Sequence, residues 1–115
     1  MSGDCLFCRI VGGELPADIV AQSDRWIAFR DIDPQAPVHV LVVPREHLSG
    51  LDDLEEEAHA GLAAELLLAA REVAVREGVE GGYRLVVNTG RPAGQTVFHL
   101  HLHVLGGRPM RWPPG

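Results

Sequence analysis

The sequence predicts an α+β fold in which an antiparallel five-stranded sheet packs on one long amphipathic helix. Two observations lead to this prediction. Five short segments, rich in apolar residues and separated by turn-forming residues, are typical of strands. One stretch, residues 52–77, instead places its apolar residues at the spacing of a helix. Because successive strands are joined in a hairpin-like way, we expect antiparallel pairing with the helix packed on the sheet.

The length of 115 residues predicts a single domain, residues 1–115. Residues 1–12 form an N-terminal C-x-x-C segment in which we expect a short helix, and residues 108–115 form a Pro-rich tail. No apolar run approaches the ~18 residues of a membrane span and no signal peptide is visible, so we expect a cytoplasmic protein without membrane contact. The net charge of −6 without an arginine cluster argues against a nucleic-acid partner.

Three strands are expected before the helix. Residues 17–24 (ADIVAQSD) and 25–32 (RWIAFRDI) are two short strands with a polar turn between them. Two prolines in the loop 33–37 exclude a helix there. Residues 39–44 (HVLVVP) are continuously apolar, which predicts a central strand that ends at its proline.

The long helix is expected to start with a capping box formed by Asp52 and Glu55 and to stop at Gly78. Its apolar residues recur at helical spacing, so one stripe should face the sheet. This stripe comprises Leu54, Ala58, Leu62, Leu66, Ala69 and Val73. His59 falls on the polar side of the helix, and we assign it no function.

The last two strands, residues 83–88 (YRLVVN) and 97–107 (VFHLHLHVLGG), flank a turn-rich loop. The second contains three of the chain's six histidines at alternate positions. Because side chains alternate between the faces of a strand, the three imidazoles should share one face. The opposite face should pack against the helix through Phe98, Leu100, Leu102 and Val104. An ordinary strand would expose Thr, Arg or Glu instead, so the histidine face indicates a functional site.

Two chemistries fit His99, His101 and His103, and their spacing does not decide between them. They could coordinate a catalytic zinc and leave a position open for water. Alternatively, one could attack a substrate while its neighbours orient it and bind substrate oxygens. The preceding loop, NTGRPAGQT, offers glycines, an amide and hydroxyl groups that could cradle a phosphate, which favours phosphoryl or nucleotidyl transfer to nitrogen.

Cys5 and Cys8 are the only cysteines and have C-x-x-C spacing. In a reducing compartment, this spacing favours metal binding or redox chemistry over a structural disulfide. A thioredoxin-type motif follows a strand within a βαβ unit, whereas this pair lies close to the start of the sequence, which weakens the redox interpretation. Two small buried residues remain the alternative.

Three segments resemble the histidine-triad (HIT) family, and its Hint branch of nucleotide-binding proteins in particular. The run HLHLHVL matches the signature in which histidines alternate with hydrophobic residues. FRDIDPQAPVHVLVVPREHLS, VVNTGRPAGQTVFHLHLHVLGGRPM and the closing WPPG extend the resemblance over essentially the whole chain. It implies the HIT-like fold, a site for a purine nucleoside 5′-monophosphate, and hydrolysis of nucleoside phosphoramidates.

The resemblance also implies catalytic roles for four residues. His101 matches the nucleophile, which would attack the α-phosphorus and form a nucleotidyl-histidine that water hydrolyses. Such a reaction needs no catalytic metal, because an imidazole is mostly unprotonated at neutral pH. His103 matches a histidine that binds phosphate oxygens or assists the leaving group. His39 matches a fourth histidine that supports the nucleophile, although on an apolar strand it could equally be a core residue. Thr96 stands where the Hint pattern usually has serine, and it keeps the hydroxyl.

Nucleotide-binding positions follow from the same resemblance. Asp31 and Ile32 match contacts to the ribose and base, and a carboxylate can accept hydrogen bonds from both ribose hydroxyls. Asn88, Gly94 and Thr96, together with His101 and His103, match residues that line the phosphate and leaving group. Trp112 matches an aromatic residue that lies near the partner subunit's site in Hint proteins, which makes a homodimer the expected assembly. Its alternative role is that of an anchoring hydrophobe.

Two more ligands would complete a tetrahedral zinc site with Cys5 and Cys8. His47 and His99 are the candidates, by resemblance to some bacterial histidine-triad proteins and to galactose-1-phosphate uridylyltransferases. There the first triad histidine is a structural ligand. The sequence thus predicts a structural zinc and no catalytic metal.

The leading hypothesis is therefore a dimeric phosphoramidate hydrolase. Three alternatives remain: a Fhit-like hydrolase of dinucleoside polyphosphates, a nucleotide-binding module whose slow hydrolysis is incidental, and a zinc hydrolase that uses all three triad histidines. The LGGRPMRWPPG ending argues against the Fhit branch.

Overall fold

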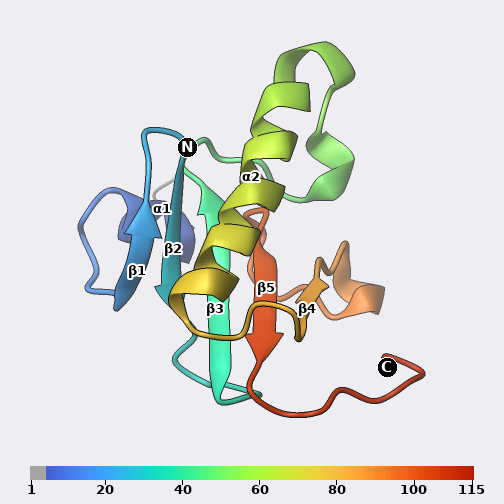
Figure 1. The fold of residues 1–115 in the computed structure, drawn as a ribbon. Coiled ribbons are helices and arrows are strands. Elements are labelled where there is room, and N and C mark those ends of the chain that lie inside the picture. The colour runs from blue at the N-terminus through green and yellow to red at the C-terminus, as the bar shows by residue number, and fades with distance from the viewer. Residues whose placement is uncertain (1–4) are drawn as a thin grey trace.

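The computed structural model describes residues 5–115, so the first four residues of the predicted N-terminal segment lie outside the described residues. Two helices and five strands make up the fold, and two short 3₁₀ turns accompany them (Figure 1). In chain order the elements are α1 (Leu6–Val11), β1 (Ile19–Gln22), β2 (Trp26–Arg30), β3 (Val38–Pro44), η1 (Leu51–Asp53), α2 (Glu56–Arg76), β4 (Tyr83–Val86), η2 (Arg91–Ala93) and β5 (Leu102–Gly106).

The five strands form one antiparallel sheet in the order β1-β2-β3-β5-β4. This confirms the predicted fold class, including the long helix and the short N-terminal one. The apolar strand β3 lies at the centre, as its composition predicts, and pairs with β5 so that Leu41 stands opposite His103. This pairing brings His39 and His103 onto neighbouring strands although 64 residues separate them.

The long helix α2 lies across one face of the sheet (Figure 1). Alternate residues of β3 and β5, such as Val40 and Val104, point into the core beneath it and meet Leu62, Leu66 and Val73. The intervening residues point to the opposite face, where Leu41 and Val43 join a second apolar cluster with Phe7 of α1 and with Ile27 and Phe29 of β2. His39 lies two residues before Leu41 on β3, and His103 stands opposite Leu41 on β5. Both histidines therefore lie on the face that α1 covers.

The start of α2 differs from the prediction. The helix begins at Glu56 rather than at residue 52, because Leu54 is extended and separates it from the 3₁₀ turn η1. The predicted capping box is absent: Glu55 is itself the N-cap residue of α2, and its side chain makes no capping hydrogen bond. At the other end the prediction of a stop at Gly78 agrees with the structure, since α2 ends at Arg76 and Gly78 has a φ of +75°.

One turn of the predicted apolar stripe is also wrong. Ala58 is exposed, and the next residue, His59, is buried in its place. The rest of the stripe packs as expected, with Leu54 partly buried and the others fully: Leu62, Leu66, Ala69 and Val73. The His59 ring caps the helix: its Nδ1 accepts from the Glu55 N–H at 2.9 Å, and its Nε2 lies 3.3 Å from the Glu46 carboxylate.

The last strand is shorter than predicted, because β5 begins only at Leu102. The residues just before Leu102 are not paired in the sheet, and the Leu100 N–H donates instead to the Leu48 carbonyl at 2.6 Å. Leu100, Leu102 and Val104 pack in the α2 core as expected, but Phe98 does not. It is 37% exposed, with the Arg91 guanidinium 5.2 Å above its ring. No helix within residues 5–115 is long and apolar enough to cross a membrane.

Candidate active site and metal centre

A cleft of about 960 Å³ opens on the α1 face of the sheet. Its apolar end is formed by α1 and the loop after it, and its polar end by the histidines and the loop before β5. Seven residues singled out from the sequence line it: Asp31, Ile32, His39, Gly94, Thr96, His101 and His103. The tertiary structure therefore brings together the residues predicted for catalysis and most of those predicted for nucleotide binding.

The ring of His101 is held by its own backbone. Its Nδ1 lies 2.7 Å from the carbonyl oxygen of His99, which can only accept, so Nδ1 donates a proton to this bond. In the neutral ring the lone pair is then on Nε2, the nitrogen that a nucleophile needs. Burial lowers the pKa of His101, although that hydrogen bond and the charge of Asp31 act in the opposite direction. The lowered pKa keeps the ring neutral at pH 7.

His39 and His103 form a directed chain of hydrogen bonds. The Gln35 N–H donates to His39 Nδ1 at 3.0 Å, so in the neutral ring the proton of His39 is on Nε2. His39 Nε2 then donates to His103 Nδ1 at 2.9 Å. This bond leaves the proton of the neutral His103 ring on its own Nε2, which becomes a donor at the floor of the cleft. The rings of His101 and His103 lie 4.9 Å apart, centroid to centroid.

His103 Nε2 is buried and has no hydrogen-bond partner among the described residues. An unpaired buried donor is costly, so it indicates a position at which a ligand supplies the acceptor. Burial, reinforced by the neighbouring His101 and His39, lowers the pKa of His103 to about 4. The group is therefore a neutral N–H donor at pH 7, suited to an anionic oxygen.

The other predicted contacts surround these rings. The carboxylate of Asp31 accepts from the Asp33 N–H at 2.9 Å, and its second oxygen lies 3.4 Å from His39 Nε2. Ile32 is 99% exposed at the mouth. Gly94 has a φ of +94°, a conformation that side chains disfavour, and the turn it forms places Thr96 at the rim of the cleft.

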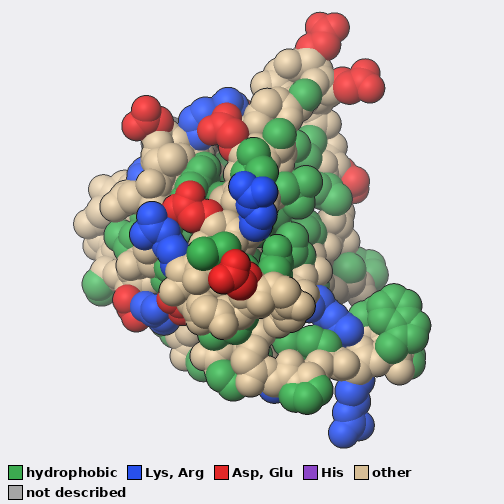
Figure 2. Space-filling model, viewed as in Figure 1, with side chains coloured by type: hydrophobic (Ala, Val, Ile, Leu, Met, Phe, Trp, Pro, Cys, Tyr) green, Lys and Arg blue, Asp and Glu red, His purple; other side chains and the backbone are tan. Residues whose placement is uncertain are grey.

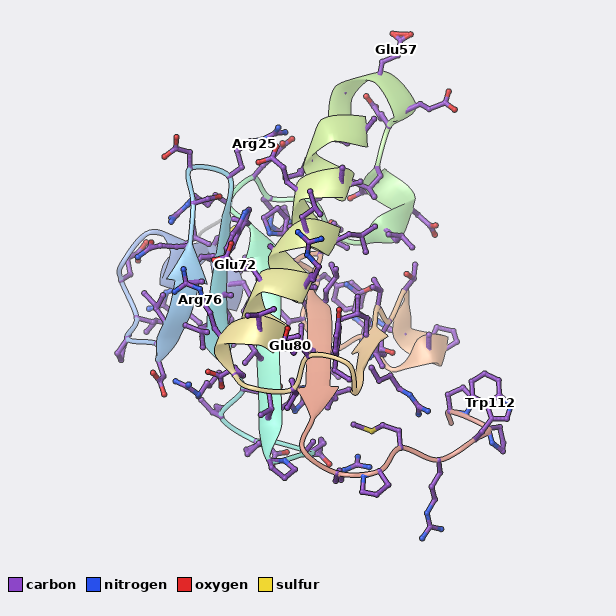
Figure 3. The ribbon with its side chains drawn as sticks, viewed as in Figure 1. Arg25, Glu57, Glu72, Arg76, Glu80 and Trp112 are labelled. Atoms are coloured by element: carbon purple, nitrogen blue, oxygen red, sulfur yellow. The ribbon has the colours of Figure 1, made fainter. Side chains whose placement is uncertain are left out.

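Two predicted nucleotide contacts are not brought to this cleft. Asn88 is half-buried after β4 and is not among the residues that line the cleft. Trp112 is 83% exposed on the C-terminal tail and projects away from α2 and the sheet (Figure 3). Within one copy of the chain, neither side chain completes the site.

Sequence reasoning missed the roles of Gln95 and Phe7. Gln95 is buried, donates from Nε2 to the carbonyls of Ser49 and Val97, and accepts from the Gly90 N–H. It braces the glycine-rich loop instead of reaching a ligand. Phe7 lines the cleft and packs edge-on against His101, with ring centroids 5.0 Å apart. An apolar residue inside a C-x-x-C motif was the available signal.

Cys5, Cys8, His47 and His99 form a second cluster beside the cleft, with their ligand atoms within 4.8 Å of one another. His99 Nδ1 lies 3.3 Å from Cys5 Sγ, 3.4 Å from Cys8 Sγ and 3.3 Å from His47 Nδ1. Cys8 Sγ lies 3.2 Å from His47 Nδ1. Ligand atoms of a tetrahedral zinc, with bonds of about 2.3 Å to sulfur and about 2.0–2.1 Å to nitrogen, lie roughly 3.3–3.8 Å apart, so this set fits zinc.

The hydrogen bond on the far side of His99 supports metal binding. Nε2 donates to the Pro44 carbonyl at 2.7 Å, which leaves the lone pair of the neutral ring on Nδ1, the atom that faces the cysteines. The ring is fully buried. Because both nitrogens are engaged in this way, and His101 Nδ1 is bound to a carbonyl, one metal ion held by all three triad histidines does not fit the arrangement.

Asp31, His39 and His103 also place three ligand-type atoms within 4.8 Å. A hydrogen bond, however, already joins two of the ring nitrogens, His39 Nε2 and His103 Nδ1. The first of them carries a proton as long as Gln35 donates to His39. This group is better described as a hydrogen-bonded chain than as a metal site.

Comparison with known proteins agrees with this site. Residues 12–110 match the family model of the HIT domain. The chain is 52% identical to an uncharacterized HIT-like protein of Synechocystis, over the full length of both. A HIT family hydrolase from Legionella pneumophila superimposes with a TM-score of 0.93 and 48% identity, covering 97% of this chain and 100% of the other. A histidine triad nucleotide-binding protein from Candida albicans does so with a TM-score of 0.81 and 27% identity, covering 96% and 83%.

The match to the family model extends over most of the chain, and the fold and the alternating histidines agree with it. The protein belongs to the HIT domain family.

Proposed function

We propose that the protein is a hydrolase of purine nucleoside 5′-phosphoramidates, of the Hint type, and that His101 is its nucleophile. The observation that carries the proposal is the state of two rings in one cleft. His101 is neutral with its lone pair on Nε2, and His103 presents an unpaired Nε2–H. The centroids of the two rings lie 4.9 Å apart. A nucleophile beside a donor for oxyanions is suited to attack on a phosphorus centre.

In the first step, His101 Nε2 forms a bond to phosphorus while the bond from phosphorus to the amine nitrogen breaks. The amine leaves after it takes up a proton. In the second step, the oxygen of a water molecule attacks phosphorus, the bond to Nε2 breaks, and the nucleoside monophosphate forms. The water supplies the hydroxyl retained on phosphorus and, net, the proton taken by the amine. His103 Nε2–H would hold a phosphoryl oxygen through both steps.

The remainder of the cleft supports a nucleotide as the substrate. Its apolar end contains Leu6, Phe7, Ile10 and Phe29, which suits a purine base. The Asp31 carboxylate lines the same cleft, 3.4 Å from His39 Nε2, and could accept from ribose hydroxyls. The structural relative from Candida albicans is named as a nucleotide-binding protein, which agrees with this assignment.

We further propose that Cys5, Cys8, His47 and His99 hold a structural zinc. The metal would tie the N-terminal segment to the end of β3 and to the chain before β5, and it would take no part in bond breaking. Purified protein should contain about one zinc per chain, and Cys5→Ser should lose it. Protein purified without chelators that contains no metal would contradict this proposal.

A homodimer is the proposed assembly. Strand β4 is an edge strand, and α2 exposes Leu67, Leu68 and Val75 on the side away from the sheet. Figure 2 shows hydrophobic side chains along this helix. In a dimer, Trp112 of one copy could reach the site of the other, as the resemblance to Hint proteins implies, which would account for its exposure in a single chain.

The test is hydrolysis of adenosine 5′-phosphoramidate by four samples: wild type, EDTA-treated wild type, His101→Ala and Cys5→Ser. We expect His101→Ala to abolish turnover while it keeps its zinc. Loss of kcat at saturating substrate after metal removal from a still-folded protein would favour a metallohydrolase, whereas a raised KM alone would not. Binding of AMP without turnover would favour a nucleotide-binding module, and preference for diadenosine polyphosphates would favour the Fhit-like alternative.

A further inference from the structure

Helix α1 belongs to both the metal centre and the cleft. Cys5 is its N-cap residue, and its Sγ accepts from the Cys8 N–H at 3.3 Å. Cys8 lies one turn further on, in the helix itself. Between the two cysteines, Leu6 and Phe7 line the apolar end of the cleft. The residues that would hold zinc therefore bracket residues that would contact the nucleotide.

Phe7 makes the connection at the level of single side chains. It is only 5% exposed, and its ring packs edge-on against His101 at a centroid distance of 5.0 Å and an angle of 89°. The same ring lies 6.0 Å from the metal-site histidine His99 and 5.5 Å from Phe29 of β2. A displacement of Phe7 would thus remove a wall of the cleft and a side support of the nucleophile together.

A helix as short as α1 does not hold its position by itself. It has six residues, whereas isolated helices below about 12 residues are marginal even in favourable sequences. Its anchors are the two cysteines and a few apolar side chains, chiefly Phe7 in the second core cluster. Within residues 5–115, no disulfide joins the two cysteines to each other. A metal ion bound by all four ligand atoms would attach the cysteines to His47 and His99.

We propose that occupancy of the four-ligand centre controls the affinity of the cleft for nucleoside monophosphates, with α1 as the link and Phe7 as the positioning residue. The proposal rests on the zinc and nucleotide sites proposed above. Metal binding fixes α1, and fixed α1 presents the base wall and holds the His101 ring. Since coupling between two binding sites is reciprocal, a nucleotide must also raise the affinity for zinc by the same factor.

The experiment measures both directions of this coupling with AMP and zinc. Titration calorimetry gives the Kd of AMP for zinc-loaded and for chelator-treated protein, and circular dichroism checks that both are folded. Competition with a chromophoric chelator gives the zinc affinity with and without saturating AMP. We expect zinc removal to raise the Kd of AMP at least about fivefold, and AMP to raise the zinc affinity by a matching factor.

Variants then test the route through α1. Phe7→Ala should keep its zinc but bring the coupling factor close to one, and Phe7→Tyr should restore much of the coupling. Arg9→Ala, an exposed position on the same helix, is the matched control and should couple like the wild type. If Phe7→Ala does not fold, hydrogen exchange of the wild type replaces it: zinc removal should speed exchange in residues 6–11 before that in β3 and β5.

The outcomes are distinguishable. AMP binding that is equally tight with and without zinc would overturn the coupling and leave the proposed function intact. No AMP binding even by the zinc-loaded protein would overturn the proposed function and, with it, this inference. Full coupling in Phe7→Ala, or global unfolding on zinc removal, would overturn the route through α1.

Discussion

The carbonyl oxygen of His99 lies 2.7 Å from Nδ1 of His101, and an acceptor at that distance holds the proton of the ring on Nδ1. His103 is set in the opposite sense, because His39 donates to its Nδ1. Two histidines two positions apart are thereby given different tasks, lone pair on one Nε2 and proton on the other. The alternation of the sequence predicted that they share a site, but only these hydrogen bonds distinguish their roles.

The pH dependence of kcat/KM should reflect this. A protonated His101 cannot attack, and burial lowers its pKa below the ordinary 6.5. The acidic limb of the activity toward adenosine 5′-phosphoramidate should therefore have its midpoint below pH 6.5. The profile is measured together with the zinc content at each pH, so that metal loss is recognised. An acidic limb at or above 6.5 with zinc retained would contradict the proposed state of His101.

Among the elements, α2 departs most from expectation at its first turn. The sequence DDLEEE suggested a helix start at Asp52, but Leu54 packs partly into the core in an extended conformation, and the helix restarts at Glu56. His59 Nδ1 accepts the hydrogen bond from the Glu55 N–H, which the Asp52 side chain would have accepted in the expected capping box. Local propensity favours several start points within such a segment, and burial of Leu54 and His59 selects one of them.

Replacement of His59 tests this cap. His59→Leu keeps a side chain of similar size at the buried position but leaves the Glu55 N–H without its acceptor, so we expect a loss of about 0.5–2 kcal/mol in the free energy of unfolding. Ala58→Ser, at the exposed neighbouring position, is the control and should change it by about 0.5 kcal/mol or less. Urea unfolding with zinc present measures both. Equal midpoints for the two variants would show that the ring is not a cap.

At the scale of the whole molecule, the sheet separates two functions. The face under α2 is an apolar core, and the face under α1 contains the cleft and the cluster of four potential metal ligands. Within residues 5–115 of a single chain, β4 pairs with no second strand, and α2 leaves Leu67, Leu68 and Val75 exposed. Arg76 and Glu72, one turn apart on α2, form an exposed ion pair (Figure 3). Exposed pairs of this kind add little stability.

The proposed dimer predicts a mass in solution of twice the 12.5 kDa of one chain. Replacing both Leu67 and Leu68 by Glu should place two carboxylates in the interface and yield monomers, since uncompensated charge is costly to bury. Glu57→Lys, at the exposed start of α2 (Figure 3), is the control that should remain dimeric. Light scattering after size-exclusion chromatography gives the masses, and a monomeric wild type would refute the assembly.

The sequence by itself determined the fold class and the alternation of three histidines, because these depend on residue type and on periodicity along the chain. The family and the four proposed metal ligands followed from the resemblance of its motifs to histidine-triad proteins. The sequence did not determine where α2 starts, that His59 is buried, that Gln95 braces a loop, or that Phe7 joins the metal centre to the cleft. These depend on contacts between distant segments, such as Cys5 and His99, 94 residues apart. Only the folded chain, with one helix on each face of the sheet, brings such pairs within reach, and their hydrogen bonds and packing then distinguish the side chains.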